Sequence, residues 1–174
     1  SVWMAYLNSL VISGTVTVLV MLLAGMAAFA MVRYRFKGRR LLDSLIVASL
    51  MFPVFSTIIP VFQMLSAIRV VDNPIGVILP QTAGNLAFAI VILMGYIRGL
   101  PIDMEESAFL EGCNVFQVFY RIIMPVCRPA FATVAIFAFL WSYNDLFTQL
   151  FFLRSPQTWA ITRFLNEVSS QFGT

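Results

Sequence analysis

The segment "EESAFLEGCNVFQVFYRIIMP", residues 105–125, interrupts a very apolar chain, and long apolar blocks lie on both sides of it. Glu105 and Glu106 at its start form a dense acidic group with Asp103, which lies just before it. Negative side chains are favoured near the positive N-terminal end of a helix dipole, and Pro101 suits a first helical turn. The pattern predicts a short acidic helix that is inserted between two apolar segments.

The second half of this segment predicts a turn and another helix. Gly112 is a helix stop signal, and Asn114 can cap a second helix that runs through "VFQVFYRIIM". Pro125 then breaks or kinks the chain, because proline lacks a backbone donor. The acidic helix carries no basic residue before Gly112, whereas helices that lie on lipid surfaces usually carry Lys and Arg. We therefore expect residues 101–125 to dock on a protein rather than on a membrane.

Composition places the chain in a membrane. Of 174 residues, 60% are hydrophobic and 11% are charged, whereas soluble domains average about 45–50% and about 25%. There is no His, and the two cysteines, Cys113 and Cys127, have no paired spacing. We expect no metal site and no disulfide framework, and we interpret both as small buried thiols. The net charge of +3 comes with no basic stripe interleaved with aromatics, so no nucleic-acid partner is expected.

Four apolar blocks are each long enough to cross a bilayer, which takes roughly 20 residues in a helix. They lack the alternation of barrel strands, and only helices or closed barrels can cross lipid. Prolines inside the second and third blocks predict kinks. The sequence therefore predicts an all-α bundle with spanning helices near residues 9–31, 44–67, 76–97 and 129–151.

The orientation follows from Arg and Lys in the short loops. Five basic residues follow the first block, in "RYRFKGRR", whereas the next loop, "RVVDNP", has only Arg69. The third loop again carries basic residues. We expect the first and third loops in the cytoplasm, and the N-terminus, the second loop and the tail outside.

The segment that begins at Glu105 resembles the EAA loop of permease subunits from bacterial binding-protein-dependent ABC importers, with the form E-A-A, three residues, G, nine residues, I-x-L-P. Glu106, Ser107 and Ala108 stand for E-A-A, and Gly112 falls at the expected distance. The matched residues end with Ile122 and Pro125, while Ser107 and Met124 depart from the pattern.

The resemblance covers nearly the whole chain. "NSLVISGTVTVLV", "RYRFKGRRLLDSLI", "DNPIGVILPQTA" and "TVAIFAFLWSYNDLF" look like the carbohydrate branch of these permeases, with the maltose-type smaller permease as the nearest type. The resemblance implies a type I ABC importer permease fold, a polytopic membrane helix bundle with a short cytoplasmic coupling helix. We expect one permease domain over residues 1–174, truncated at both ends, with one spanning helix missing before it and one after it.

The implied function is that of a membrane-spanning permease subunit of an ATP-driven sugar importer in the bacterial inner membrane. The chain lacks a phosphate-binding G-x-x-x-x-G-K-[ST] loop and is not expected to be an enzyme or to bind a cofactor itself. ATP and Mg²⁺ would lie on two partner ATPase subunits. The other implied partners are a second permease subunit, identical or different, and an extracytoplasmic solute-binding protein.

The resemblance assigns ATPase coupling to Glu105, Glu106, Ser107, Ala108, Gly112, Ile122 and Pro125. Tyr143, Asn144 and Asp145 occupy the place of a W-N-E/D stretch, with Tyr143 departing from it, and are candidates for the substrate path. An ionisable residue in an apolar segment suggests function, but Asp145 can equally cap or pack a helix end. Weaker candidates for the path are Gln63, Gln81, Asn85, Ser142 and Gln149.

Three alternatives remain open from the sequence. The substrate of the importer can be another small solute. The chain can be an ion-coupled secondary transporter, although such proteins tend to use charged residues near the midplane and this chain offers only Asp145, nearer the outside end of its helix. It can also be a structural or assembly membrane protein without a substrate. Co-purification of an ATPase separates the importer from the last two.

Overall fold

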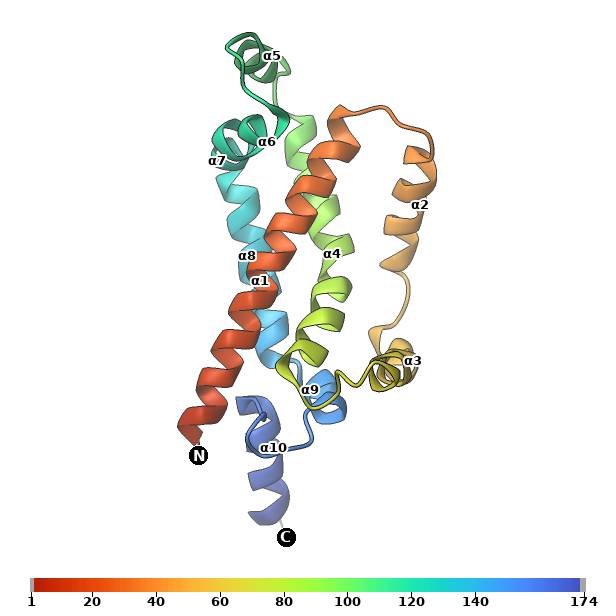
Figure 1. The fold of residues 1–174 in the computed structure, drawn as a ribbon, viewed down its shortest axis with the longest axis vertical. Helices are drawn as coiled ribbons and strands as arrows, with labels where there is room; N and C mark the ends of the chain where they lie inside the picture. The colour runs from red at the N-terminus through yellow and green to blue at the C-terminus, as the bar shows by residue number, and fades with distance from the viewer. Residues whose placement is uncertain (1, 173–174) are drawn as a thin grey trace. The chain divides into compact units, whose positions relative to one another are not determined.

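The computed structural model describes residues 2–172, without the side chains of residues 54, 55 and 172. Within this part of the chain the regular elements are all helices, which confirms the all-α class (Figure 1). The chain divides into two compact units, and the expectation of a single permease domain stays a prediction. Unit 1 comprises Ser1–Leu19, Phe52–Asn85 and Phe137–Thr174, and unit 2 comprises Val20–Met51 and Leu86–Ile136.

The first helix, α1 (Val2–Arg33), contains the predicted 9–31 segment and supplies both units. Its buried residues recur every three or four positions, which puts them on one face of the helix. In unit 1 this face consists of Ala5, Ser9, Ile12, Ser13 and Val16, and in unit 2 of Val20, Ala24 and Ala28. Mostly small side chains allow close packing along this face.

The predicted helix over residues 44–67 is wrong as a single helix. The chain forms α2 (Arg39–Ser49) in unit 2 and α3 (Val54–Ala67) in unit 1. The break has a local cause: Pro53 is extended at ψ 124° and precedes α3, and proline disfavours helical geometry in the residue before it. Pro60, by contrast, is accommodated inside α3, and no side chain of α2 is buried.

The third predicted segment, 76–97, corresponds to α4 (Pro74–Arg98), which contains Pro80. The fourth, 129–151, is divided into α8 (Arg128–Asn144) and α9 (Leu146–Phe152). Asp145 separates them, because its backbone is extended and its side chain caps α9. A last helix, α10 (Ile161–Phe172), belongs to unit 1 and follows a loop after α9.

By length and composition, α1 and α4 are the two helices in residues 2–172 that can each cross a membrane. A third crossing is obtained if residues 115–126 and 128–144, which are bent by 84° relative to each other, count as one span. The shorter apolar helix over Ser56–Ala67 has the composition but not the length. The number of membrane crossings therefore stays a prediction.

Candidate functional site: an acidic helix and a polar network

The predicted acidic helix is α5 (Asp103–Leu110) in unit 2, and Figure 1 shows it projecting beyond α6 and α7. Its first turn holds Asp103, Glu105 and Glu106, as the helix dipole favours. Pro101 lies just before the helix rather than in its first turn, because α5 begins at Asp103. The hydroxyl of Ser107 donates to the carbonyl of Asp103, four residues earlier in the same helix, at 2.8 Å.

The C-terminus of α5 is closed by two backbone hydrogen bonds. Gly112 has φ +87°, in the left-handed region, and its N–H donates to the carbonyl of Phe109 at 3.0 Å. The N–H of Cys113 donates to the carbonyl of Ala108 at 3.0 Å. These bonds make a Schellman motif, in which glycine is favoured because it has no Cβ. The helix stop predicted at Gly112 is confirmed.

The predicted cap at Asn114 is also confirmed. The Asn114 Oδ1 accepts from the Gln117 N–H at 2.9 Å, and the Asn114 N–H donates to Gln117 Oε1 at 2.8 Å. This reciprocal capping box starts α6 (Val115–Val118) directly after the α5 turn. The two caps leave little freedom between α5 and the helical segment behind it.

The segment after α6 departs from a regular α-helix. It forms the π-helical element η1 (Phe119–Ile123) and the short α7 (Met124–Val126), with Pro125 inside α7. A proline cannot donate to the carbonyl one turn earlier, and wider π-helical turns occur where the α-helical ladder is interrupted. Ile122 and Pro125, assigned to coupling by the resemblance, are half-buried here. Their positions indicate a role in shaping the segment behind α5.

The helix α5 has an inner and an outer face. Glu105 and Ala108, three residues apart, are buried, whereas Glu106 and Ser107 are exposed. Leu110 is 90% exposed, so a large apolar side chain lies at the free end of an acidic surface. An exposed leucine among carboxylates suits contact with another protein. The coupling roles assigned to these residues stay predictions.

An ion pair fastens the inner face. Arg33 Nε donates to Glu105 Oε1 at 2.6 Å, and Arg33 Nη2 donates to the Leu100 carbonyl at 3.0 Å. Only 12% of the Arg33 side chain and 4% of the Glu105 side chain are exposed. From the sequence, Arg33 was used only to predict the membrane orientation. No local sequence pattern predicts that it pairs with Glu105, which lies 72 positions later.

Aromatic rings pack close to the backbone of α1 in unit 2. A Cβ at Gly25 would lie 2.9 Å from ring atoms of Phe119 and Phe131. The Phe119 ring also lies 5.8 Å from that of Phe29 and 6.5 Å from that of Phe131, measured between centroids. A side chain at position 25 would therefore force these rings to shift.

A polar network lies among apolar helices in unit 1. The Gln81 amide nitrogen donates to Asp145 Oδ2 at 2.9 Å, and Ser142 Oγ donates to Gln81 Oε1 at 2.5 Å. The other Asp145 oxygen, Oδ1, accepts from the Thr148 N–H at 3.1 Å and caps α9. The capping interpretation of Asp145 is thus confirmed, and a role in the substrate path stays a prediction.

The network continues to α10. The Gln149 amide nitrogen lies 3.5 Å from the Ser142 carbonyl, and the Thr162 hydroxyl donates to Gln149 Oε1. Gln81, Ser142 and Gln149 are all buried, so the structure brings three of the weaker candidates together. The sequence did not predict the contact of Thr162, because this residue lies in the polar tail after the last apolar block, outside the predicted helices.

The remaining path candidates are placed differently. The Asn85 amide nitrogen donates to the Gln81 carbonyl at 2.7 Å, and its buried Oδ1 has no hydrogen-bond partner among residues 2–172. Asn144 is exposed and donates to the Leu140 carbonyl at 2.7 Å, and Tyr143 stacks on Phe139 at 5.7 Å. Gln63 is exposed on α3 and takes no part in this network.

Asp72, which the sequence did not single out, organises the loops of unit 1. Its carboxylate accepts from the Arg154 N–H at 2.9 Å, from the N–H and hydroxyl of Ser155, and from the Thr158 hydroxyl at 2.9 Å. Burial opposes the charged form, but these hydrogen bonds prevail and lower the pKa of Asp72 to about 2. We call this arrangement the Asp72 clasp. It ties the α3–α4 loop to the loop after α9.

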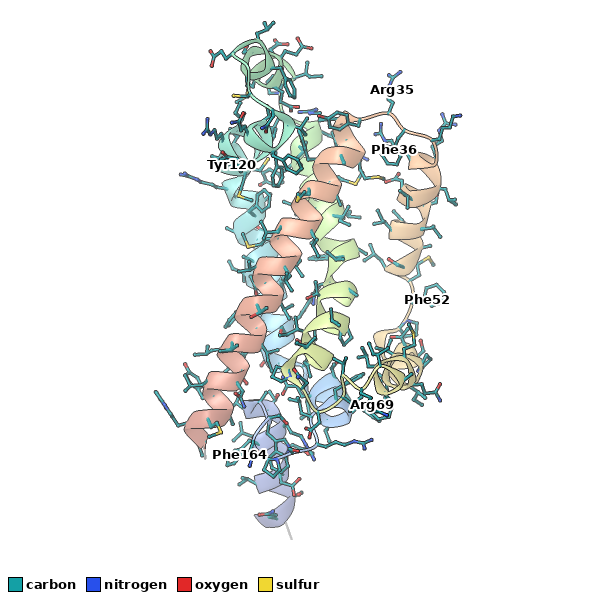
Figure 2. The ribbon with its side chains drawn as sticks, viewed as in Figure 1. Arg35, Phe36, Phe52, Arg69, Tyr120 and Phe164 are labelled. Carbon is teal, nitrogen blue, oxygen red and sulfur yellow. The ribbon has the colours of Figure 1, made fainter. Side chains whose placement is uncertain are left out.

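The loop between α1 and α2 is exposed. Figure 2 shows Arg35 and Phe36 in the α1–α2 loop, with Arg35 pointing away from the ribbon. Both side chains are exposed, as is Tyr120 in η1. Of the five basic residues that follow the first apolar block, Arg35, Lys37 and Arg40 are exposed on unit 2, whereas Arg33 is held in the ion pair with Glu105.

Comparisons with known proteins agree with this architecture. The chain is 34% identical over 158 residues to the diacetylchitobiose uptake system permease protein NgcG of Streptomyces coelicolor, covering 91% of this chain and 52% of that protein. It is 38% identical over 149 residues to the osmoprotective compounds uptake permease protein GgtD of Synechocystis sp., covering 86% of this chain and 50% of that protein. The chain thus spans about half the length of these relatives.

The fold matches a solved structure with a TM-score of 0.89 and 22% identity, over 99% of this chain and 60% of that one. That structure is a bacterial ABC transporter involved in the import of the acidic polysaccharide alginate, and at this identity the match establishes the fold alone. Residues 4–172 match the family described as the binding-protein-dependent transport system inner membrane component. The chain therefore belongs to this family of membrane transport components.

Proposed function

We propose that this chain is a membrane-spanning permease subunit of an ATP-driven importer, and that α5 couples the closure of partner ATPases to alternating access. The observation that carries the proposal is the two-faced α5: capped at its C-terminus, fastened through Glu105, and exposing Glu106 and Leu110. Transport of this kind is a switch between two packings of the protein, biased by ligands and nucleotide. A helix that is rigidly attached at its inner face suits the transmission of such a switch.

The assembly that we propose has four kinds of component. Two ATPase subunits, which hold ATP and Mg²⁺, dock on α5 and on the corresponding helix of a second permease subunit. An extracytoplasmic solute-binding protein delivers the substrate to the other side of the inner membrane. The chain itself crosses the bilayer several times and binds no cofactor. Membership of a binding-protein-dependent transport family supports these partners.

We further propose a sugar as the substrate. One relative is named for the uptake of diacetylchitobiose, a disaccharide. The predicted spans of this chain hold no Lys or His, and their single acid, Asp145, is occupied by Gln81 and by the α9 cap. A charged substrate would be poorly compensated in this low-dielectric environment, whereas hydroxyl groups need only hydrogen bonds. Another small solute is the second candidate, since a relative is named for the uptake of osmoprotective compounds.

The docking function is tested with Glu106→Lys in the full transporter. A reversed charge at an interface can cost several kcal/mol, so we expect ATPase co-purification and substrate-stimulated hydrolysis to fall sharply while the permease still inserts in the membrane. Glu111→Lys, on the exposed C-cap of the same helix, is the matched control for a change of net charge. Normal co-purification and uptake with Glu106→Lys would contradict docking through the outer face of α5.

The substrate class is tested by radiolabelled uptake in proteoliposomes, with sugars, amino acids and phosphate esters compared. We expect uptake of a mono- or oligosaccharide, and we expect Asn144→Ala and Asp145→Ala to reduce uptake more than basal ATP hydrolysis. Uptake of an amino acid and of no sugar would remove the sugar proposal and leave the permease proposal standing. Uptake driven by a proton gradient without ATP would instead favour a secondary transporter.

A further inference from the structure

Two adjacent glutamates of α5 lie on different faces of the helix, one buried and one exposed. Glu105 is 3% exposed and paired with Arg33, whereas Glu106 is exposed. We propose that the Arg33–Glu105 pair is the mechanical attachment that transmits movement of α5 to α1, and that Glu105 positions α5 without touching the ATPase. This inference rests on the proposed coupling function. It adds that movement of α5 reaches α1 through the Arg33–Glu105 pair.

The geometry of Arg33 supports this role. The residue is the last of α1, and its guanidinium bonds both the Glu105 carboxylate, at 2.6 Å, and the Leu100 carbonyl, at 3.0 Å. Leu100 lies in the linker between α4 and α5. One side chain therefore joins the end of α1 to both the linker and the helix. A fixed planar fork of donors suits such a junction better than the single point charge of lysine.

The side chains around the attachment are buried. Ala108, on the same face of α5 as Glu105, is buried. The thiol of Cys127, at the junction before α8 in the same unit, is fully buried. A buried ion pair that loses one partner leaves an uncompensated charge, so breaking this junction while α5 stays packed against it is costly.

The test separates attachment from docking. In the full transporter, Glu105→Gln removes the charge at nearly constant shape, and Glu106→Lys removes docking. We expect Glu105→Gln to keep ATPase co-purification and hydrolysis but to lower the ratio of uptake to ATP hydrolysed by on the order of tenfold. Glu111→Gln, an exposed carboxylate on the same helix, should change neither quantity.

Two further measurements distinguish positioning from a general loss of structure. The double variant Arg33→Glu with Glu105→Arg should partly restore the uptake ratio, incompletely because a glutamate at position 33 cannot donate to the Leu100 carbonyl. Amide hydrogen exchange across α5 should accelerate in Glu105→Gln, with or without ATPase. If Glu105→Gln does not assemble, Arg33→Lys carries the test, since it keeps the charge and loses the fork.

The outcomes separate this inference from the proposed function. If the wild-type permease binds no ATPase, the coupling function fails, and transmission through this pair fails with it. If the wild-type transporter couples normally and Glu105→Gln keeps both its uptake ratio and its α5 exchange rates, only the attachment is overturned. If Glu105→Gln loses ATPase binding as fully as Glu106→Lys, Glu105 is a docking contact and the division of roles is wrong.

Discussion

Replacing Gly112 tests whether the end of α5 depends on backbone conformation or on free space. The residue has φ +87°, and a Cβ added to it meets no atom within 4 Å. A side chain is therefore accommodated sterically within this chain, and the cost of a substitution comes from the left-handed backbone. That cost is roughly 1–2 kcal/mol for an ordinary L-residue, less for Asn and more for a β-branched residue.

This cost predicts a measurable loosening of the turn. Since about 1.4 kcal/mol corresponds to a factor of ten, Gly112→Ala should raise the local opening equilibrium by about 5- to 30-fold. The opening breaks the hydrogen bonds that the N–H groups of residues 112 and 113 donate to Phe109 and Ala108. Hydrogen exchange of these amides in the purified permease reports it directly. We expect the rates to rise in the order wild type, Asn, Ala, Val.

The matched control is Gly95→Ala, on the exposed side of α4 in the same unit. Gly95 also has no atom within 4 Å of an added Cβ, but its backbone is helical, so alanine should leave exchange at the α5 turn unchanged. Equal exchange rates in the wild type and in Gly112→Val would refute the backbone argument. Normal exchange in Gly112→Asn together with lost ATPase binding would show instead that the ATPase approaches the glycine closely.

Three other predictions follow from the loops and from the packing of α1. Because the folded pKa of Asp72, about 2, lies below the ordinary 3.8, the Asp72 clasp stabilises the loops fully above about pH 4 and loses this contribution as the pH falls toward 2. Proteolysis of the loop after α9 should accelerate over that range in the wild type, and Asp72→Asn should show fast cleavage already at neutral pH. Gly25→Ala should destabilise the permease by about 1–3 kcal/mol through overpacking, whereas Gly14→Ala, with no atom within 4 Å, should not; thermal unfolding in detergent compares them. In a cysteine-free background, Lys37→Cys should resist an impermeant thiol reagent added outside cells and Asn73→Cys should react, and the reverse pattern would overturn the orientation.

The local order of the coupling segment was available from the sequence, because its signals act over a few residues. The acidic first turn, the glycine at a left-handed position and the asparagine cap each depend on neighbours within four positions. The helix α5 ends before Gly112 and α6 begins directly after Asn114, as the pattern predicts, but α6 ends at Val118 and is followed by η1, short of the predicted end at Met124. The EAA resemblance and the apolar blocks likewise identified the family and the all-α class.

Hydropathy alone could not locate the helix breaks. Residues 44–67 and 129–151 read as uniform apolar runs, yet Pro53 and Asp145 divide them. A hydropathy average measures the mean preference of many residues for an apolar environment. A helix break depends on a single residue, either a proline that lacks a backbone N–H donor or a side chain that caps the next helix. The prolines at 60 and 80 lie inside continuous helices, so the residue type by itself does not decide the outcome.

Only the tertiary structure decided which polar residues meet. The Arg33–Glu105 pair joins residues 72 positions apart, and the Asp72 clasp joins residues more than 80 positions apart. In sequence, Glu105 and Glu106 are equivalent members of one acidic run. Their difference arises because a helix turns about 100° per residue, which directs one carboxylate toward Arg33 and the other outward. Composition and short-range signals thus determined the all-α class and the local helices, the motif resemblance indicated the family, and packing determined which carboxylate of α5 is paired and which is exposed.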